Sequence, residues 1–483
     1  MGRMCTACIC GCQPSNTTRR PRLGLVYVPP GMSDNEWSTS EGVVDVDGET
    51  FDPLADAVEA PPLGRPRALI RFPVFNYPEW NQQGQLVKSD NSLHAKLASF
   101  IAGARPGSKI RIALSSWQVG DKSVPKDALL LALKGAFERG VSVKFVGPVT
   151  WKNPDPSDPE NKVEWYQLDV DSLLKKEIDA LFGDNVRYWR GGGGLAANIN
   201  HNKIVLFSDV DSPSLNATQI VTTCSGNWRG RDRDRQNDMM VIAGDAELYT
   251  AYMYYWAALW AAADRKPVPA YKKIYDNPAM GTRAYFLPYP DGYPQGPSPR
   301  DPALGLLNDI VSGPTSRIRV AQATWGYSGR GKAIYDALVA RADEGCDVRI
   351  LAHHELEALD EDLYLRCTIE PLATDAVPTG KCETHQVIWD KLAQHGGIPW
   401  GKSPTHTKIM LVDAPLKSLG GSENHQIVLM GSLNFSGSIE YAGKGMTENV
   451  LMIRDDTELF GLYEEYWQWL CTETWKSDGT PCA

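Results

Sequence analysis

The sequence has no long apolar run, which limits how the protein could meet a membrane. A transmembrane helix needs ~20 predominantly apolar residues. The best candidate, residues 248–263, is uncharged but shorter than that, and its counterpart in the second half contains Glu464 and Glu465. We therefore interpret residues 248–263 as a buried amphipathic helix. We expect no transmembrane helix, and so a protein that is soluble or peripheral at a membrane surface.

Basic charge is also scarce. The 49 Lys and Arg are outnumbered by 59 Asp and Glu, which gives a formal net charge of -10. Nucleic-acid binding normally depends on a basic face that displaces counterions. The charge balance therefore argues against a polyanionic partner, although a local basic pocket can occur on an acidic protein.

Metal-ligand patterns are missing as well. The cysteine cluster at residues 5–12 has no second pair of ligands at tight spacing nearby, and the other six cysteines show no metal spacing. We therefore predict no metal and no other cofactor. Two cysteine pairs would close short disulfide loops in an exported protein, with buried thiols as the alternative; they are Cys367 with Cys382 and Cys471 with Cys482. Because both interpretations fit the cysteines, the sequence does not indicate the cellular compartment.

Residues 1–64 lack a steady hydrophobic period and are rich in Pro, Gly, Ser and acidic groups. We predict an irregular N-terminal extension there. Its first residues fit the pattern for N-myristoylation at Gly2, with neighbouring thiols for palmitoylation. A disordered cysteine-containing leader is the alternative, and the segment has no continuous apolar core of a secretory signal.

What the sequence does contain is an internal duplication. An apolar strand-like run at 110–113 is echoed at 318–321, and a helix-like stretch that stops near Gly140 is echoed by one that stops near Gly345. Such a repeat predicts two copies of one α/β unit, at 65–270 and 271–483. With 42% hydrophobic residues, the chain is long enough for two packed domains of roughly 200 residues.

Each half also carries one histidine–lysine motif at the start of an apolar run. His201 and Lys203 form the first, and His406 and Lys408 form the second. Because side chains alternate along a strand, the histidine and lysine of each motif should point to the same face. A lone His-x-Lys is ordinarily a surface pair, but two copies with matched downstream clusters argue against that interpretation.

The downstream clusters are polar and follow their motifs at almost the same spacing. They contain Ser225 and Asn227 in the first half, and Ser432 and Asn434 in the second. If the halves face each other, these groups and the two lysines would hold the non-bridging oxygens of a phosphodiester. One imidazole could attack phosphorus and form a phosphohistidine, while the other protonates the leaving oxygen and later activates water or an alcohol. This chemistry requires no metal.

Other polar residues receive different interpretations. Ser208 and Asp413 lie an odd number of residues from their histidines, so we expect them to face away from the pocket and to be structural. An arginine-rich loop, interleaved with Asp232 and Asp234, would ordinarily be solvated, but its place after Asn227 suits contact with an anionic head group; it contains Arg229, Arg231, Arg233 and Arg235. The remaining histidines are expected to be structural or exposed; they are His94, His353, His354, His385, His395 and His425.

With these residues the chain resembles the phospholipase D superfamily, whose hallmark is two copies of H-x-K-x-x-x-x-D followed by G-S-x-N. The second copy matches in full, through His406, Lys408, Asp413, Gly431, Ser432 and Asn434. The first departs at Ser208, where Asp is usual, and at Cys224, where Gly is usual. The resemblance covers residues 65–483.

The resemblance implies a fold and a division of roles. The fold would be two similar α/β domains, each a mixed sheet flanked by helices, related by a pseudo-twofold with the active site at their interface. His201 would be the nucleophile and His406 the general acid. The family also orients each histidine through a carboxylate from the opposite half, which implies Glu448 for His201. The matching place in the first half is Asn237 or Asp238, and since only Asp238 can supply charge we predict Asp238.

Our first prediction of function is a phospholipase D-type phosphodiesterase that hydrolyses phospholipid head groups or transfers them to an alcohol. Its 15 Trp and 19 Tyr suit a membrane interface, and no obligate protein partner is implied. One alternative is a metal-independent nuclease on single-stranded nucleic acid, in which the same aromatics would stack on bases. Another is a non-catalytic lipid-binding homologue, motivated by Ser208 and Cys224.

Overall fold

The structure is a computed structural model that describes most of the chain beyond residue 68. The described residues are 45–46, 49–50, 69–81, 85–151, 167–169, 172–189, 197–266, 268–288, 301–326, 329–353, 385–435, 445–473 and 476–478. The lipidation pattern at Gly2 lies outside them. So do Cys367 and Cys382, and Cys482, the expected partner of Cys471.

The first half forms a seven-stranded sheet in the order β11-β8-β6-β13-β14-β16-β3. Strands β6, β8 and β11 run parallel to one another, and the remaining neighbours are antiparallel. The strands are β3 (Ile70–Phe75), β6 (Lys109–Leu114), β8 (Ser142–Gly147), β11 (Val186–Tyr188), β13 (Lys203–Ser212), β14 (Leu215–Cys224) and β16 (Asp238–Ala243).

The second half repeats this sheet with the same order and the same strand directions. Seven of its strands run β21-β20-β19-β22-β23-β24-β18, and β17 and β25 extend the two edges. The strands are β17 (Ile274–Asn277), β18 (Thr282–Leu287), β19 (Arg317–Gln322), β20 (Asp347–His353), β21 (Trp400–Ser403), β22 (Lys408–Pro415), β23 (Asn424–Gly431), β24 (Gly445–Arg454) and β25 (Lys476–Asp478). The predicted fold of two similar α/β halves is confirmed, while the domain boundaries at 64 and 270 stay a prediction.

Smaller strands join or flank these sheets. Strand β12 (Ala197–Asn200) belongs to the first half of the sequence but pairs with β24 of the second sheet. The others form two-stranded pairs; they are β1 (Asp45–Val46) with β2 (Glu49–Thr50), β4 (Glu79–Trp80) with β5 (Leu86–Lys88), β7 (Trp117–Gln118) with β15 (Trp228–Arg229), and β9 (Val149–Trp151) with β10 (Gln167–Asp169).

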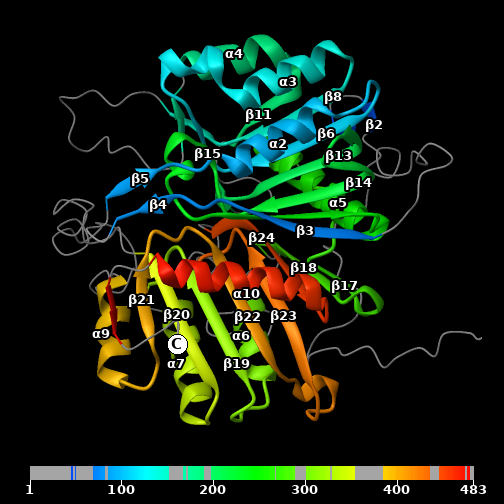
Figure 1. Cartoon of the computed structure of the whole chain (residues 1–483). Coiled ribbons are helices and arrows are strands. Elements are labelled where there is room, and N and C mark those ends of the chain that lie inside the picture. Colours follow the sequence, from blue (N-terminus) through cyan, green and yellow to red (C-terminus); the bar gives the residue numbers. More distant parts are fainter. Residues whose placement is uncertain are drawn as a thin grey trace, which may run out of the picture.

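Helices form three layers around the two sheets (Figure 1). The outer face of the first sheet is covered by α2 (Ser92–Ala102), α3 (Ala128–Glu138) and α4 (Leu173–Phe182). The outer face of the second is covered by α6 (Pro302–Asp309), α7 (Gly329–Asp343) and α9 (His385–His395). Between the sheets lie α5 (Ala246–Ala263) and α10 (Thr457–Thr472).

Strand alternation connects these layers. In β13, Ile204 and Leu206 face the core between the sheets, while Val205 and Phe207 face the outer core of the first half. Strand β22 divides its apolar residues in the same way. Both sheets are therefore buried on two faces, which explains why their central strands are continuous apolar runs.

Helix α5 corrects one expectation. It is buried on nearly every side, from Leu248 to Ala263, so it is apolar all round and not amphipathic. Such a helix belongs inside a large core. Asp245 caps its first turn by accepting a hydrogen bond from the N–H of Leu248. Among the described helices, none is long and apolar enough to cross a membrane.

Ser208 and Asp413 lie toward the far ends of the motif strands. The Ser208 hydroxyl accepts the backbone N–H of Lys109 at 2.8 Å. The Asp413 carboxylate accepts hydrogen bonds from Arg317 at 2.6 Å and from Asn424 at 2.9 Å. Both side chains therefore join neighbouring segments of their own half.

This placement predicts that Asp413→Asn alters stability and leaves turnover intact. The Arg317 side chain is 39% exposed, so loss of the ion pair should lower the free energy of unfolding by up to ~1 kcal/mol. Thermal melting and phosphodiesterase assays on the same preparation would check this. A large loss of rate at an unchanged melting temperature would contradict the structural role, and Ser208→Asp provides the parallel test in the first half.

Candidate functional site

The two motif histidines meet the opposite half of the chain through their backbones. His201 and His406 stand two residues before Lys203 and Lys408, where β13 and β22 begin. The backbone N–H of His201 donates to the carbonyl of Thr447 at 3.0 Å, just ahead of Glu448. The backbone N–H of His406 donates to the carbonyl of Gln236 at 2.7 Å. Each histidine is therefore anchored to the final sheet strand of the other half, as the pseudo-twofold implies.

His201 is fully enclosed and held by a carboxylate. Its Nδ1 lies 2.8 and 2.9 Å from the two oxygens of Glu448. A carboxylate can only accept, so Nδ1 carries the ring proton and Nε2 carries the lone pair. The hydroxyl of Ser432 donates to Glu448 at 2.5 Å, which fixes the carboxylate in turn. Burial lowers the pKa of His201 to about 4, although the negative charge of Glu448 opposes this.

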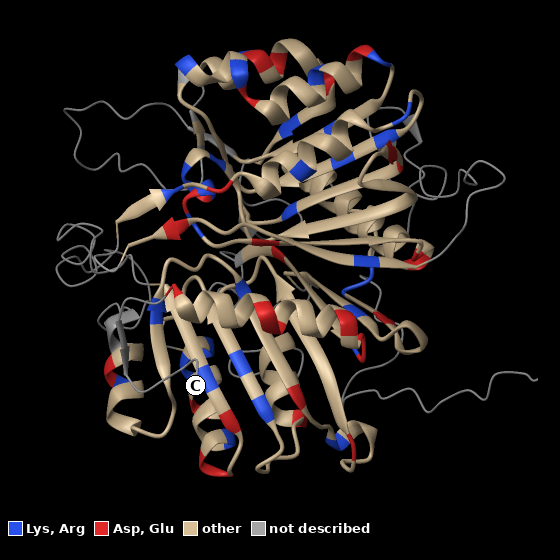
Figure 2. Ribbon diagram, viewed as in Figure 1, with Lys and Arg blue, Asp and Glu red and all other residues tan. Residues whose placement is uncertain are grey.

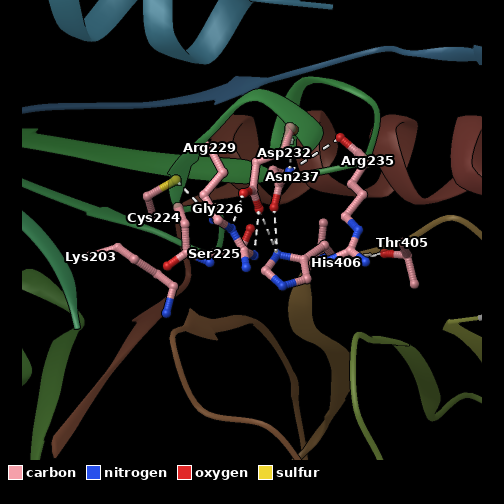
Figure 3. A network of polar contacts seen from close by, with 12 residues as sticks. Lys203, Cys224, Ser225, Gly226, Arg229, Asp232, Arg235, Asn237, Thr405 and His406 are labelled. Atoms are coloured by element: carbon pink, nitrogen blue, oxygen red, sulfur yellow. Dashed lines mark hydrogen bonds and ion pairs between the residues drawn. The ribbon is translucent and has the colours of Figure 1, made fainter. Parts of the chain in front are cut away.

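His406 is held by an amide in place of a carboxylate. Its Nδ1 lies 2.8 Å from Oδ1 of Asn237 (Figure 3). The Asn237 Nδ2 group donates to the carbonyls of Asp232 and Arg235, so the amide oxygen must face the imidazole. His406 therefore also carries its proton on Nδ1. Burial lowers the pKa of His406 well below its ordinary value, and the charge of Lys408 adds to this effect.

The expectation that Asp238 contacts His406 is wrong by one residue. Backbone pairing aligns Asp238 with Asn449, since the N–H of Ser225 donates to the Asp238 carbonyl as Ser432 does to Asn449. The residue equivalent to Glu448 is therefore Asn237. Side chains alternate along a strand, so Asp238 faces the other way, and its carboxylate accepts the Tyr463 hydroxyl at 3.1 Å. Burial raises the pKa of Asp238.

A carboxylate does approach His406, from a residue assigned to a solvated loop. Asp232 Oδ1 lies 3.8 Å from Nδ1 of His406, and Asp232 is itself held by Arg229 through a contact of 2.6 Å (Figure 3). Burial acts to raise the pKa of Asp232, but the charge of Arg229 holds it below its ordinary value. Asp232 and Arg229 are thus buried parts of the site that periodicity and motif spacing did not identify.

The two lysines converge on the same pocket. Lys203 Nζ donates to the carbonyl of His201 at 2.6 Å, and Lys408 Nζ donates to that of His406 at 2.7 Å. Burial lowers the pKa of Lys203 to about 8. Burial and the charge of Lys203 together lower the pKa of Lys408 well below its ordinary value. Two buried cations this close create a strong preference for an anion between them.

The serines and asparagines of the polar clusters have separate roles. The Ser225 hydroxyl accepts the backbone N–H of Asp238 at 2.9 Å, and the Ser432 hydroxyl donates to Glu448, so both hydroxyls have partners within the protein. Their contact with substrate stays a prediction. The buried amide of Asn227 has no hydrogen-bond partner in the described part of the chain. The same holds for Oδ1 of Asn434. A buried polar group without a partner is costly, so these amides are suited to a ligand.

One histidine outside the motifs supports the site indirectly. His94, near the start of α2, contacts the backbone oxygen of Asn227 through Nε2 at 3.0 Å. Burial lowers the pKa of His94. This fits the structural role expected for His94, although no sequence signal predicted its contact with Asn227. Within the described residues, no group of three or more His, Cys, Asp and Glu is arranged to hold a metal ion.

Comparisons with known proteins agree with this geometry. Residues 307–471 match the family described as "Cardiolipin synthase, PLD-like domain". The phosphatidylserine synthase of Haemophilus influenzae Rd KW20 is similar in structure, with a TM-score of 0.50 and 11% identity over 80% of this chain and 86% of that one. No curated protein sequence matches significantly.

Two further solved structures are more distant. The polyphosphate kinase of Porphyromonas gingivalis gives a TM-score of 0.42 at 11% identity and covers 83% of this chain, which spans 50% of the kinase. The Nuc protein of Salmonella typhimurium, a phospholipase D family member, gives 0.26 at 20% identity over 41% of this chain and 97% of its own.

The family match falls on the half with the complete second motif. The first half repeats the same sheet order, and the synthase of H. influenzae shares the fold across most of both chains. The second half of the chain therefore matches the PLD-like domain family over residues 307–471, and the chain as a whole shares the fold of that synthase.

Proposed function

We propose that the protein is a phospholipase D-type phosphodiesterase that removes or exchanges phospholipid head groups through a phosphohistidine on His201. The observation that carries this proposal is the reciprocal clamp: each buried histidine is fixed through Nδ1 by the opposite half, beside a buried lysine. Both rings are thereby oriented through Nδ1, and chemistry at a shared anion site would use the two Nε2 atoms.

The first half-reaction uses the two histidines in different roles. Nε2 of His201 attacks phosphorus, an N–P bond forms, and the bond to the leaving alcohol breaks. His406, in its doubly protonated form, gives the proton on Nε2 to the departing oxygen. Glu448 is the stronger partner for a histidine that becomes positively charged, which supports His201 as the nucleophile.

The second half-reaction reverses the proton transfer. His406, now neutral, removes a proton from water or from an acceptor alcohol, and the resulting oxygen attacks phosphorus. The P–N bond breaks and His201 is restored. Lys203, Lys408 and the unpartnered amide of Asn227 would stabilise the additional negative charge on the phosphoryl oxygens.

A lipid substrate has the better support. The description of the family that matches residues 307–471 names cardiolipin synthase. The H. influenzae protein that shares the fold is a phosphatidylserine synthase. The net charge of -10 weighs against a nucleic-acid substrate. In the view of Figure 2, Lys and Arg are interspersed with Asp and Glu over the described parts of both halves.

A direct assay tests this proposal. Purified protein in EDTA is offered phosphatidylcholine vesicles and labelled single-stranded DNA in parallel. We expect lipid turnover that survives chelation, and losses of at least ~10³-fold in both His201→Asn and His406→Asn, because covalent attack and proton transfer both require an imidazole. Turnover of DNA alone would favour the nuclease, and no turnover of either would favour a lipid-binding role. Asn216→Asp, on the exposed far end of β14, is the control variant.

The assignment of the nucleophile can be checked by trapping. A reaction quenched in mid-turnover should leave an acid-labile phosphoryl adduct on the peptide that contains His201. The His406→Asn variant should still form the adduct from a substrate with a good leaving group, because such a group needs little protonation. The adduct should then break down slowly. Peptide mapping that placed the label on His406 would reverse the two roles.

The amide partner of His406 predicts a pH effect. Asn237→Asp would place a carboxylate 2.8 Å from Nδ1 and so raise the pKa of His406. Since the acid form is required for leaving-group protonation, the descending limb of kcat/KM should move to higher pH, by about one unit or more. Profiles of Asn237→Asp and the control Asn216→Asp, which adds the same charge at a distance, measure the shift. An unchanged limb would mean that His406 does not supply the proton.

A further inference from the structure

A cavity of about 460 Å³ opens in the first half beside the residues that hold His406. Its lining combines apolar side chains, among them Trp117 and Leu168, with a group of three arginines. The arginines are Arg229 on β15, and Arg231 and Arg233 on the short 3-10 helix that follows it, Gly230–Arg233. The cavity has the size of a small-ligand site and the lining of one that receives an organic anion.

Arg229 is the residue that indicates a ligand. Its side chain is only 2% exposed, and its Nε and Nη2 donate to the carboxylate of Asp232. Its Nη1 is buried and has no hydrogen-bond partner in the described part of the chain. A buried guanidinium donor without an acceptor is unfavourable, so Nη1 of Arg229 is suited to an oxygen acceptor supplied by a ligand.

The cavity adjoins the reaction site through the same arginine. Asp232, which Arg229 holds, lies 3.8 Å from the imidazole of His406. Figure 3 shows Arg229 and Asp232 on the side of His406 that also carries Asn237. A substrate whose phosphodiester lies between the two histidines would therefore have one of its substituents within reach of the cavity.

We propose that this cavity binds the head group of the substrate and selects head groups that carry a second oxyanion, a carboxylate or a phosphate monoester. This inference rests on the proposed function and narrows its substrate class. Guanidinium groups pair with both oxyanions in bidentate geometry, whereas a choline head group would bring a positive charge against three arginines. The apolar lining would cover the carbon atoms of the same head group.

The test compares two lipids that differ in this respect. Phosphatidylserine and phosphatidylcholine are offered to the full chain in the same detergent micelles. We expect kcat/KM to favour phosphatidylserine by about tenfold or more, and Arg231→Gln and Arg233→Gln to remove that preference, chiefly by lowering kcat/KM for phosphatidylserine. Lys134→Gln, on the exposed face of α3, is the matched control for loss of one positive charge.

A binding measurement separates failure of this inference from failure of the proposed function. Inorganic pyrophosphate is titrated calorimetrically into the wild-type protein and the same variants. If neither lipid turns over but Arg231→Gln and Arg233→Gln weaken pyrophosphate binding about tenfold, the anion site is supported. The same result would contradict the proposed lipid reaction. Equal rates on both lipids, or a preference and a pyrophosphate affinity that the arginine variants leave unchanged, would overturn the inference.

Discussion

The site depends on one reciprocal constraint: the final sheet strand of each half holds the histidine of the other. His201 takes its backbone and side-chain partners from Thr447 and Glu448, and His406 takes its own from Gln236 and Asn237. Neither half can complete a site by itself. The two sheets must therefore be positioned accurately relative to each other, and the central layer of α5 and α10 provides that rigidity through a core shared by both halves.

Departure from symmetry is as informative as the symmetry itself. Glu448 and Asn237 occupy equivalent backbone positions in the two halves. The imidazole of His201 is therefore hydrogen-bonded to a negative charge, whereas that of His406 is hydrogen-bonded to a neutral amide. A neighbouring carboxylate stabilises a permanently charged intermediate, whereas an amide leaves the ring easy to deprotonate. Asp232 Oδ1 lies 3.8 Å from Nδ1 of the same imidazole, and the Asp232 carboxylate is paired with Arg229. The two rings are thus prepared for different tasks.

The sequence predicted the duplication and the strand motifs, because these follow from local periodicity and matched spacing, whereas the pairing of Glu448 with His201 was implied by the family resemblance. It failed at Asp238, where charge was preferred over register: an alignment from the helix N-caps Asp245 and Asp456 would have selected Asn237 as the counterpart of Glu448. It also could not identify Asp232 and Arg229, since a mixed run of Arg and Asp has the same appearance whether it is solvated or buried. Their burial depends on chain packing between segments distant in sequence, which no local pattern encodes.

The layer formed by α5 and α10 determines what would happen if the two halves were separated. Each of these helices covers its own sheet on one side and contacts the other half's core on the opposite side. An isolated half would expose that second side as a wide apolar surface, complementary to another copy of itself by virtue of the repeat. A fragment of residues 271–483 should therefore self-associate about a twofold axis.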